Sequence, residues 1–84
     1  MPERDVLVFD GACGVCTWLA DWVGRRDARQ RLAIVPYQTA DLDALAPGLT
    51  REMAARSVYL VTRRGPRYHG ARAAFDAVKR LPAA

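Results

Sequence analysis

Both cysteines of the chain lie in one short stretch, residues 10–16, which reads Asp-Gly-Ala-Cys-Gly-Val-Cys. Two residues separate Cys13 from Cys16, so a single helical turn would bring the two thiols close together. Two thiols so placed can close reversibly into a disulfide, or bind a soft metal ion as thiolates. We therefore expect the chemistry of this protein at Cys13 and Cys16.

The segments on either side of the pair predict how it is held. Residues 5–9 contain the apolar run Val-Leu-Val-Phe, which is typical of a short strand covered on both faces. Residues 13–23 have the spacing of an amphipathic helix, and Asp10 and Gly11 favour a turn between the two. At a helix N-terminus the unpaired N–H groups and the helix dipole stabilise a thiolate.

The helical periodicity also predicts which side chains of this segment are buried. Cys13 falls beside the polar sector and Cys16 lies toward the apolar side, which predicts an exposed first thiol and a shielded second one. Trp18 and Trp22 share a second apolar stripe and are expected in the core. Gly24 is expected to end the helix.

The rest of the chain supplies further strand and helix candidates. Residues 32–37 predict a second strand, parallel to the first. Within residues 38–56, Thr39 and Thr50 are expected to cap two short helical turns. Residues 57–62 and 67–69 predict an antiparallel hairpin around Arg-Arg-Gly-Pro.

A last helix is expected to open at Gly70. Its expected core face is made of Ala71, Ala74, Phe75, Val78 and Leu81. The predicted order is β-α-β, a helical link, then β-β-α. This is the minimal thioredoxin-like arrangement, an α/β fold with a βαβ unit and a ββα unit around a small mixed sheet. We expect one such domain over residues 1–84.

Composition narrows the class of protein. The chain has 84 residues with 51% hydrophobic content, and no apolar run approaches the roughly 18 residues of a membrane helix. The first residues lack the pattern of a signal peptide, so a cytoplasmic location is expected. Two cysteines in a cytoplasmic protein favour redox or metal chemistry over a structural disulfide. The net charge of +4 is spread along the sequence, and a solvated basic surface is favoured over a nucleic-acid interface.

Residues 8–16 resemble the opening of the DCC (DUF393) family of thiol-disulfide oxidoreductases, named for an Asp-x-x-Cys-x-x-Cys signature. Asp10, Cys13 and Cys16 match the signature. Weaker similarities follow in the family's order at residues 25–27, 35–38 and 58–74. In thioredoxins and glutaredoxins a cis-proline precedes the third core strand, whereas this chain has Arg-Ser at residues 56–57.

The resemblance implies thiol-disulfide exchange, with Cys13 as nucleophile and Cys16 as resolving thiol. It also suggests that Asp10 helps to move the proton of Cys16, although a turn or cap role is an equal alternative from the residue type alone. The implied partners are a protein or small-molecule disulfide substrate and a thiol reductant. We expect no cofactor, no nucleic acid and no membrane, and the oligomeric state is left open.

Two other classes of function stay open. One is a soft-metal module that binds copper or zinc through the two cysteines. Copper chaperones of this kind carry a methionine two residues before the first cysteine, where this chain has Gly11, and a structural zinc site needs more ligands than the pair and the distant His69 supply. The other is a thioredoxin-like interaction domain without catalytic activity.

Overall fold

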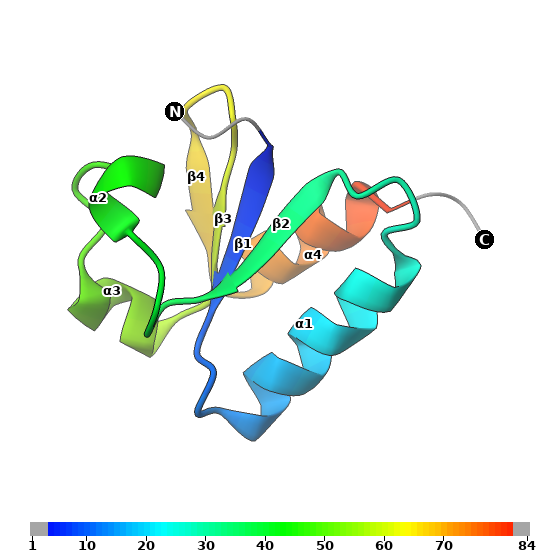
Figure 1. Ribbon diagram of the computed structural model, residues 1–84, viewed down its shortest axis with the longest axis horizontal. Coiled ribbons are helices and arrows are strands. Elements are labelled where there is room, and N and C mark those ends of the chain that lie inside the picture. Colours follow the sequence, from blue (N-terminus) through cyan, green and yellow to red (C-terminus); the bar gives the residue numbers. More distant parts are fainter. Residues whose placement is uncertain (1–3, 82–84) are drawn as a thin grey trace.

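The computed structural model describes residues 4–81, which form a four-stranded mixed sheet with helices on both faces (Figure 1). The strands are β1 (Asp5–Phe9), β2 (Leu32–Pro36), β3 (Tyr59–Val61) and β4 (Arg67–His69). The helices are α1 (Gly14–Arg26), α2 (Leu42–Leu45), α3 (Arg51–Arg56) and α4 (Ala71–Lys79). The predicted order of strands and helices is confirmed.

The sheet has the strand order β2-β1-β3-β4. β1 and β2 are parallel, with Asp5 opposite Leu32 and Phe9 opposite Pro36. A parallel pair needs a crossover connection, and α1 provides it. β3 is antiparallel to both β1 and β4. This mixed sheet confirms the predicted βαβ unit and hairpin, and the fold is α/β and thioredoxin-like.

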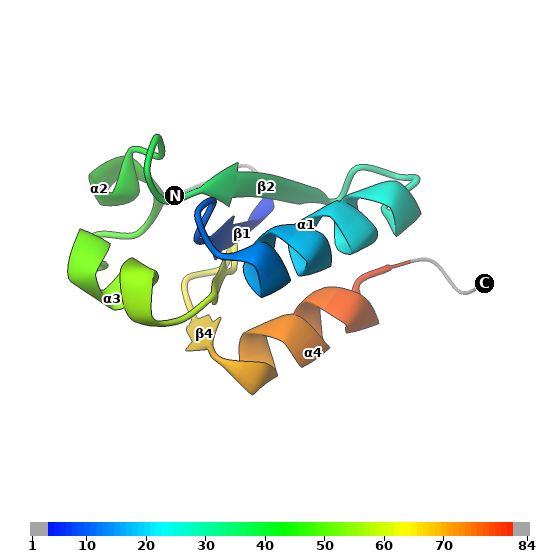
Figure 2. The ribbon, with the colours of Figure 1, turned by 90° about the horizontal axis from the view of Figure 1, so that it is seen from below.

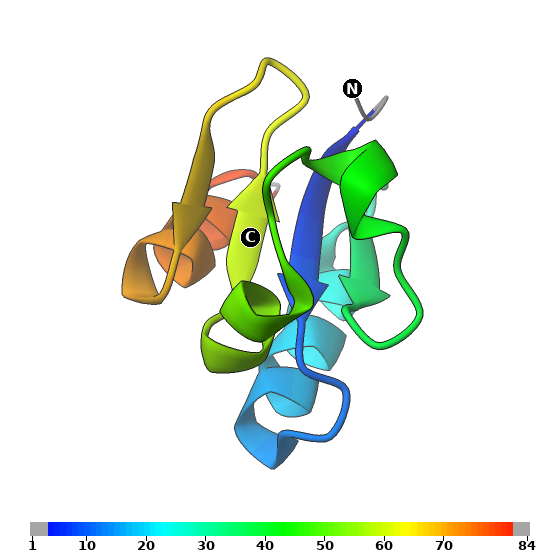
Figure 3. The same cartoon turned by 90° about the vertical axis from the view of Figure 1, so that its left-hand side faces the viewer.

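Alternation along the strands divides the core between two helical layers. Leu7 and Leu60 are fully buried on the face covered by α1 and α4, where they join Val23, Ala73 and Ala77. The side chains of Val6 and Val8 point to the other face, against α2, α3 and the residues between them. Figures 2 and 3 show α1 and α4 side by side on one face and α2 and α3 on the other.

Two predictions for helix α1, its end at Gly24 and the burial of Trp18, were wrong. It continues through Gly24 to Arg26, because a glycine inside a helix costs only about 1 kcal/mol. A Cβ on Gly24 would lie 3.4 Å from Ile34 Cδ1, so the missing side chain lets α1 pack closely on β2. Trp18 is 65% exposed and does not belong to the core, whereas Trp22 is half-buried against the core between the sheet and the two long helices.

The predicted core face of α4 was mostly wrong. Ala73 and Ala77 are fully buried, whereas Phe75 is 65% exposed and Val78 is 40% exposed. Alanines bring the helix axis close to the sheet, and the larger apolar residues then lie on its outer side. Of the residues predicted to face the core, Leu81 does pack against the buried cluster, Ala74 is half-buried and Ala71 is exposed.

The connection between β2 and β3 holds the two short helices. Asp41, not Thr39, caps α2, with its Oδ1 accepting from the Ala44 N–H at 3.3 Å. The predicted cap at Thr50 is confirmed, since its Oγ1 accepts from the Met53 N–H at 3.2 Å. The caps fix where α2 and α3 begin and so place Arg51 at the start of α3.

Candidate active site

Cys13 is the N-cap residue of α1. Its backbone is extended, with φ −92° and ψ 122°, and its Sγ accepts from the Cys16 N–H at 3.4 Å. The Cys13 N–H itself donates to the Asp10 carbonyl at 3.1 Å. The sulfur thus takes the place of the serine or aspartate oxygen that commonly caps a helix. A thiolate in this position satisfies one of the orphan N–H groups of the helix.

The pKa values of the two thiols are shifted in opposite directions. The pKa of Cys13 is lowered, first by the hydrogen bond from the Cys16 N–H and then by one from the Cys16 thiol. The pKa of Cys16 is raised, first because its thiol donates to Cys13, then by burial and by the nearby Cys13 charge. The Asp10 carboxylate raises the pKa of both, as a smaller contribution.

Exposure does not separate the two cysteines as predicted. Both residues are half-buried, and both thiols are free. The expected contrast between an exposed Cys13 and a shielded Cys16 is therefore not seen. The difference between them comes from hydrogen bonding, because Cys13 accepts at the cap while Cys16 donates.

Asp10 directly follows β1 and holds the turn that leads to Cys13. Its Oδ1 accepts from the Ala12 N–H at 2.9 Å and from Gln38 Nε2 at 2.6 Å. Within residues 4–81, no hydrogen bond reaches its Oδ2. The turn role considered for Asp10 is thus present in the structure, and its part in moving the Cys16 proton stays a prediction.

Gln38 connects the turn to the end of β2. While its Nε2 donates to Asp10, its Oε1 accepts from the Gly11 N–H at 3.0 Å. A Cβ on Gly11 would lie 3.3 Å from both Gln38 Oε1 and Pro36 Cβ, tighter than ordinary van der Waals contact. The glycine therefore lets the turn approach β2 closely enough for both hydrogen bonds to form.

Arg51 fixes Gln38 from the opposite helical layer. Its Nη1 donates to the Tyr37 carbonyl at 2.9 Å and to the Gln38 carbonyl at 3.2 Å. A continuous set of hydrogen bonds thus runs from α3 through Gln38 to the turn before the cysteines. Sequence reasoning assigned no role to Gln38 or Arg51, because their partners lie 13 to 28 residues away along the chain.

The soft thiolate donors at this site are the two cysteine sulfurs. Among residues 4–81 no group of three or more His, Cys, Asp and Glu side chains is placed to hold a metal ion. His69 lies on β4, separated from β1 by β3, and its ring stacks on Tyr59 with centroids 5.5 Å apart.

In the described part of the chain, no peptide bond is cis. No helix there is long and apolar enough to cross a membrane.

The strand order, the two helical layers and a Cys-x-x-Cys pair at the start of α1 define a thioredoxin-like fold with a dithiol site. The family model of the DCC1-like thiol-disulfide oxidoreductases matches residues 7–84. The chain belongs to that family, which confirms the resemblance seen in the sequence. Among curated proteins and solved structures, none matches the chain.

Proposed function

We propose that this protein exchanges disulfides with a substrate through Cys13 and Cys16. The single observation that carries the proposal is the cap itself, in which the Cys16 N–H donates to the Cys13 sulfur at 3.4 Å. This contact stabilises the Cys13 thiolate, and the thiolate is the form of cysteine that attacks a disulfide. Membership of the family supports the same chemistry.

In the first step the Cys13 thiolate attacks one sulfur of the substrate disulfide. A bond forms between Cys13 Sγ and that sulfur, the substrate S–S bond breaks, and the other substrate sulfur leaves as a thiolate. Val15 is 77% exposed and Gly14 has no side chain, so the approach to Cys13 along this turn of α1 is open. The product is a mixed disulfide on Cys13.

In the second step the Cys16 thiol loses its proton and attacks Cys13 Sγ. The mixed disulfide breaks, the second substrate sulfur leaves, and Cys13 and Cys16 close into a disulfide. Two electrons have then passed from the pair to the substrate. The raised pKa of Cys16 keeps it protonated until this step, and Asp10 Oδ2 is the carboxylate oxygen we assign to accept the proton.

A thiol reductant returns the pair to the dithiol form, and the same steps in reverse oxidise a substrate dithiol. The direction in the cell depends on the reduction potential of the pair relative to that of its compartment. A cytoplasmic location, predicted from the sequence, would favour the reducing direction.

Trapping of the intermediate tests the proposal. The Cys16→Ser variant, mixed with a disulfide-bonded peptide, should accumulate a mixed disulfide on Cys13 that mass spectrometry detects. The Cys13→Ser variant should form far less adduct and should lose turnover of the peptide. Equal adduct formation by the two variants, or turnover that survives Cys13→Ser, would contradict the assignment of Cys13 as the nucleophile.

A further inference from the structure

The end of the sheet opposite the cysteines holds a polar pocket of about 520 Å³. It is lined by Arg4, Asp5, Arg29, Gln30, Arg31 and Arg63. These residues come from the start of β1, the loop between α1 and β2, and the turn between β3 and β4. The fold thus gathers into one place arginines that the sequence spreads over 60 positions.

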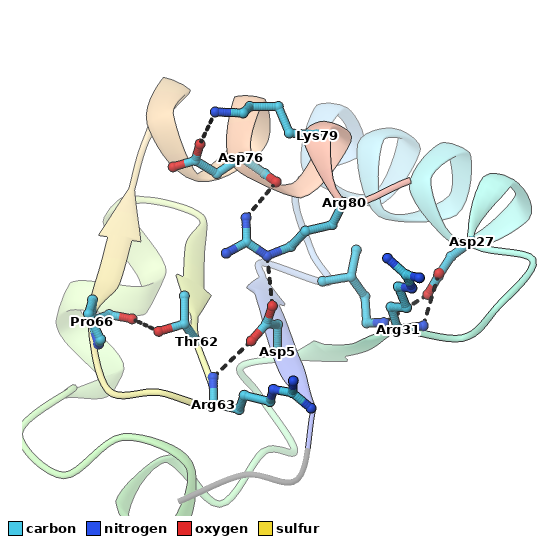
Figure 4. A network of polar contacts seen from close by, with 10 residues as sticks. Asp5, Asp27, Arg31, Thr62, Arg63, Pro66, Asp76, Lys79 and Arg80 are labelled. Carbon is cyan, nitrogen blue, oxygen red and sulfur yellow. Dashed lines mark hydrogen bonds and ion pairs between the residues drawn. The ribbon is translucent and has the colours of Figure 1, made fainter. Parts of the chain in front are cut away.

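Among residues 4–81, Asp5 is the only carboxylate that lines this pocket, and both of its oxygens are occupied (Figure 4). Oδ1 accepts from the Arg63 N–H at 2.8 Å, and Oδ2 accepts from Arg80 Nε at 2.7 Å. The ion pair that Asp5 makes is therefore with Arg80, which does not line the pocket. The guanidinium groups of the pocket therefore have no ion-pair partner among residues 4–81.

The four lining arginines make no ion pair with any carboxylate of residues 4–81. The nearby Asp27 is buried, and its two oxygens accept from the backbone N–H groups of Arg31 and Leu32 at 3.0 and 2.9 Å. Arg4 Nη1 donates to the Gln30 carbonyl at 3.2 Å, which keeps one guanidinium at this loop. Four arginine side chains thus surround one pocket, and a bound anion would reduce the repulsion between their charges.

We propose that this pocket binds a small multivalent phosphate anion, such as a polyphosphate or the polyphosphate part of a phosphorylated metabolite. Arginine is the side chain best suited to phosphate, because its planar fork donates two parallel hydrogen bonds. In the described part of the chain, no aromatic side chain lines the pocket to stack on a base. Recognition therefore rests on the phosphate groups. This site is separate from the dithiol and does not depend on the proposed function.

Titration with tripolyphosphate at low ionic strength tests the proposal. Calorimetry should give saturable binding, and the amide signals of Gln30, Leu32 and Arg63 should shift in NMR spectra. Arg29→Gln and Arg63→Gln should each weaken binding roughly tenfold, the effect of losing about one charged hydrogen bond. Arg56→Gln is the matched control, because Arg56 is exposed on α3 and outside the pocket, and it should change the affinity less than about twofold.

Three results would overturn the proposal. They are the absence of saturable binding, equal weakening by the pocket variants and by Arg56→Gln, and amide shifts spread over the whole basic surface. An intact thermal unfolding transition in each variant shows that lost affinity does not come from lost folding. Cys13→Ser should bind tripolyphosphate as the wild type does, so this test is independent of the redox proposal. Binding to vesicles with phosphoinositide headgroups, compared with binding of free tripolyphosphate, distinguishes a lipid ligand from a free phosphate.

Discussion

The backbone N–H of Cys16 donates to the sulfur of Cys13 across 3.4 Å, so the first turn of α1 lowers the pKa of the thiol that caps it. This contact needs no cationic neighbour, and the hydrogen bonds from Cys16 are the main causes that lower the pKa of Cys13. It depends only on where α1 begins. The turn before the helix, held by Asp10 and Gln38, therefore positions the cap on which the proposed chemistry depends.

Two substitutions of Cys16 should separate the two hydrogen bonds that reach Cys13. Both Cys16→Ser and Cys16→Ala keep the backbone N–H, but only serine can replace the side-chain donor. We expect the pKa of Cys13 to stay low in Cys16→Ser and to rise in Cys16→Ala, while remaining below the ordinary value of about 8.5. The pH dependence of the Cys13 alkylation rate measures both values.

The direction of this pH dependence follows from the fact that the thiolate, not the thiol, is alkylated. A lowered pKa means that Cys13 is already a thiolate at a pH where an ordinary cysteine is still protonated, so its alkylation rate should level off at lower pH. A Cys13 that titrates like a free cysteine in the wild type would show that the cap does not activate it.

Substitution of Asp10 should distinguish its turn role from a role in proton transfer. Asp10→Asn keeps an Oδ1 that can accept from the Ala12 N–H, whereas Asp10→Ala removes it. We expect Asp10→Asn to change the unfolding free energy by less than about 1 kcal/mol and Asp10→Ala by about 1–2 kcal/mol. If Asp10 accepts the Cys16 proton, both variants should resolve the mixed disulfide roughly tenfold more slowly or worse. Rapid-quench mass spectrometry measures that rate, and an unchanged rate in Asp10→Asn would leave only the turn role.

Loss of the Gln38 side chain should loosen the turn before the cysteines. In Gln38→Ala the Gly11 N–H and Asp10 Oδ1 each lose a partner, at a cost of about 1 kcal/mol. Hydrogen exchange of the Gly11 amide should accelerate, while that of Leu7 inside β1 should not. Thr39→Ala is the control, because Thr39 is exposed and makes no side-chain hydrogen bond within residues 4–81. Unchanged Gly11 exchange in Gln38→Ala would contradict the role of this contact.

The ion pair between Asp5 and Arg80 joins the start of β1 to the end of α4 and should make stability depend on pH. Burial alone raises the pKa of Asp5, but the Arg63 N–H and the Arg80 guanidinium together lower it. The ionised carboxylate therefore contributes stability above its unfolded pKa of about 3.9, and this contribution is lost as the pH falls through the lower folded value.

Asp5→Asn should lower the unfolding free energy by about 1–3 kcal/mol at neutral pH, and the difference from the wild type should shrink as the pH falls below the unfolded pKa of about 3.9. Denaturant unfolding across this pH range measures the effect. Asp21→Asn is the control, since the Asp21–Arg25 pair is 60% and 76% exposed and contributes less than about 0.5 kcal/mol. A constant difference at all pH values would show that the charge of Asp5 is not responsible.

The two tryptophans of α1 should differ in their effect on stability. Trp22 packs against the core of Leu7 and Val23, so Trp22→Ala should cost about 2–3 kcal/mol. Trp18 is 65% exposed, and Trp18→Ala should stay within about 0.5 kcal/mol. Thermal unfolding of both variants checks this contrast, and a comparable loss for Trp18→Ala would mean that its side chain is covered in solution.

Local signals in the sequence were sufficient to predict the order of strands and helices and the place of the dithiol. The apolar run of β1, the Asp-Gly turn and the Thr50 cap are each read from adjacent residues. Side-chain burial was harder to predict, because a helical wheel shows where apolar residues cluster but not how closely a helix approaches the sheet. In α4 the small Ala73 and Ala77 set that approach, and Phe75 remained outside.

The contacts that position the site were not predictable from the sequence for a related reason. Gln38 and Arg51 are polar residues in the least regular part of the chain, and no spacing pattern connects them to Asp10. Their roles appear only when the end of β2 lies beside the end of β1, with Tyr37 N–H donating to the Phe9 carbonyl at 2.8 Å. The same holds for the arginine pocket, which three distant segments build together.

The most direct test of the central claim is the redox equilibrium of Cys13 and Cys16 across a series of glutathione ratios under metal-free conditions. Free thiols are counted by alkylation and mass spectrometry. We predict one reversible two-electron transition between the dithiol and the Cys13–Cys16 disulfide, with Cys13 alkylated faster than Cys16 in the reduced form. A pair that never closes into a disulfide, or that is protected by copper or zinc carried through purification, would contradict the oxidoreductase and favour a metal-binding role.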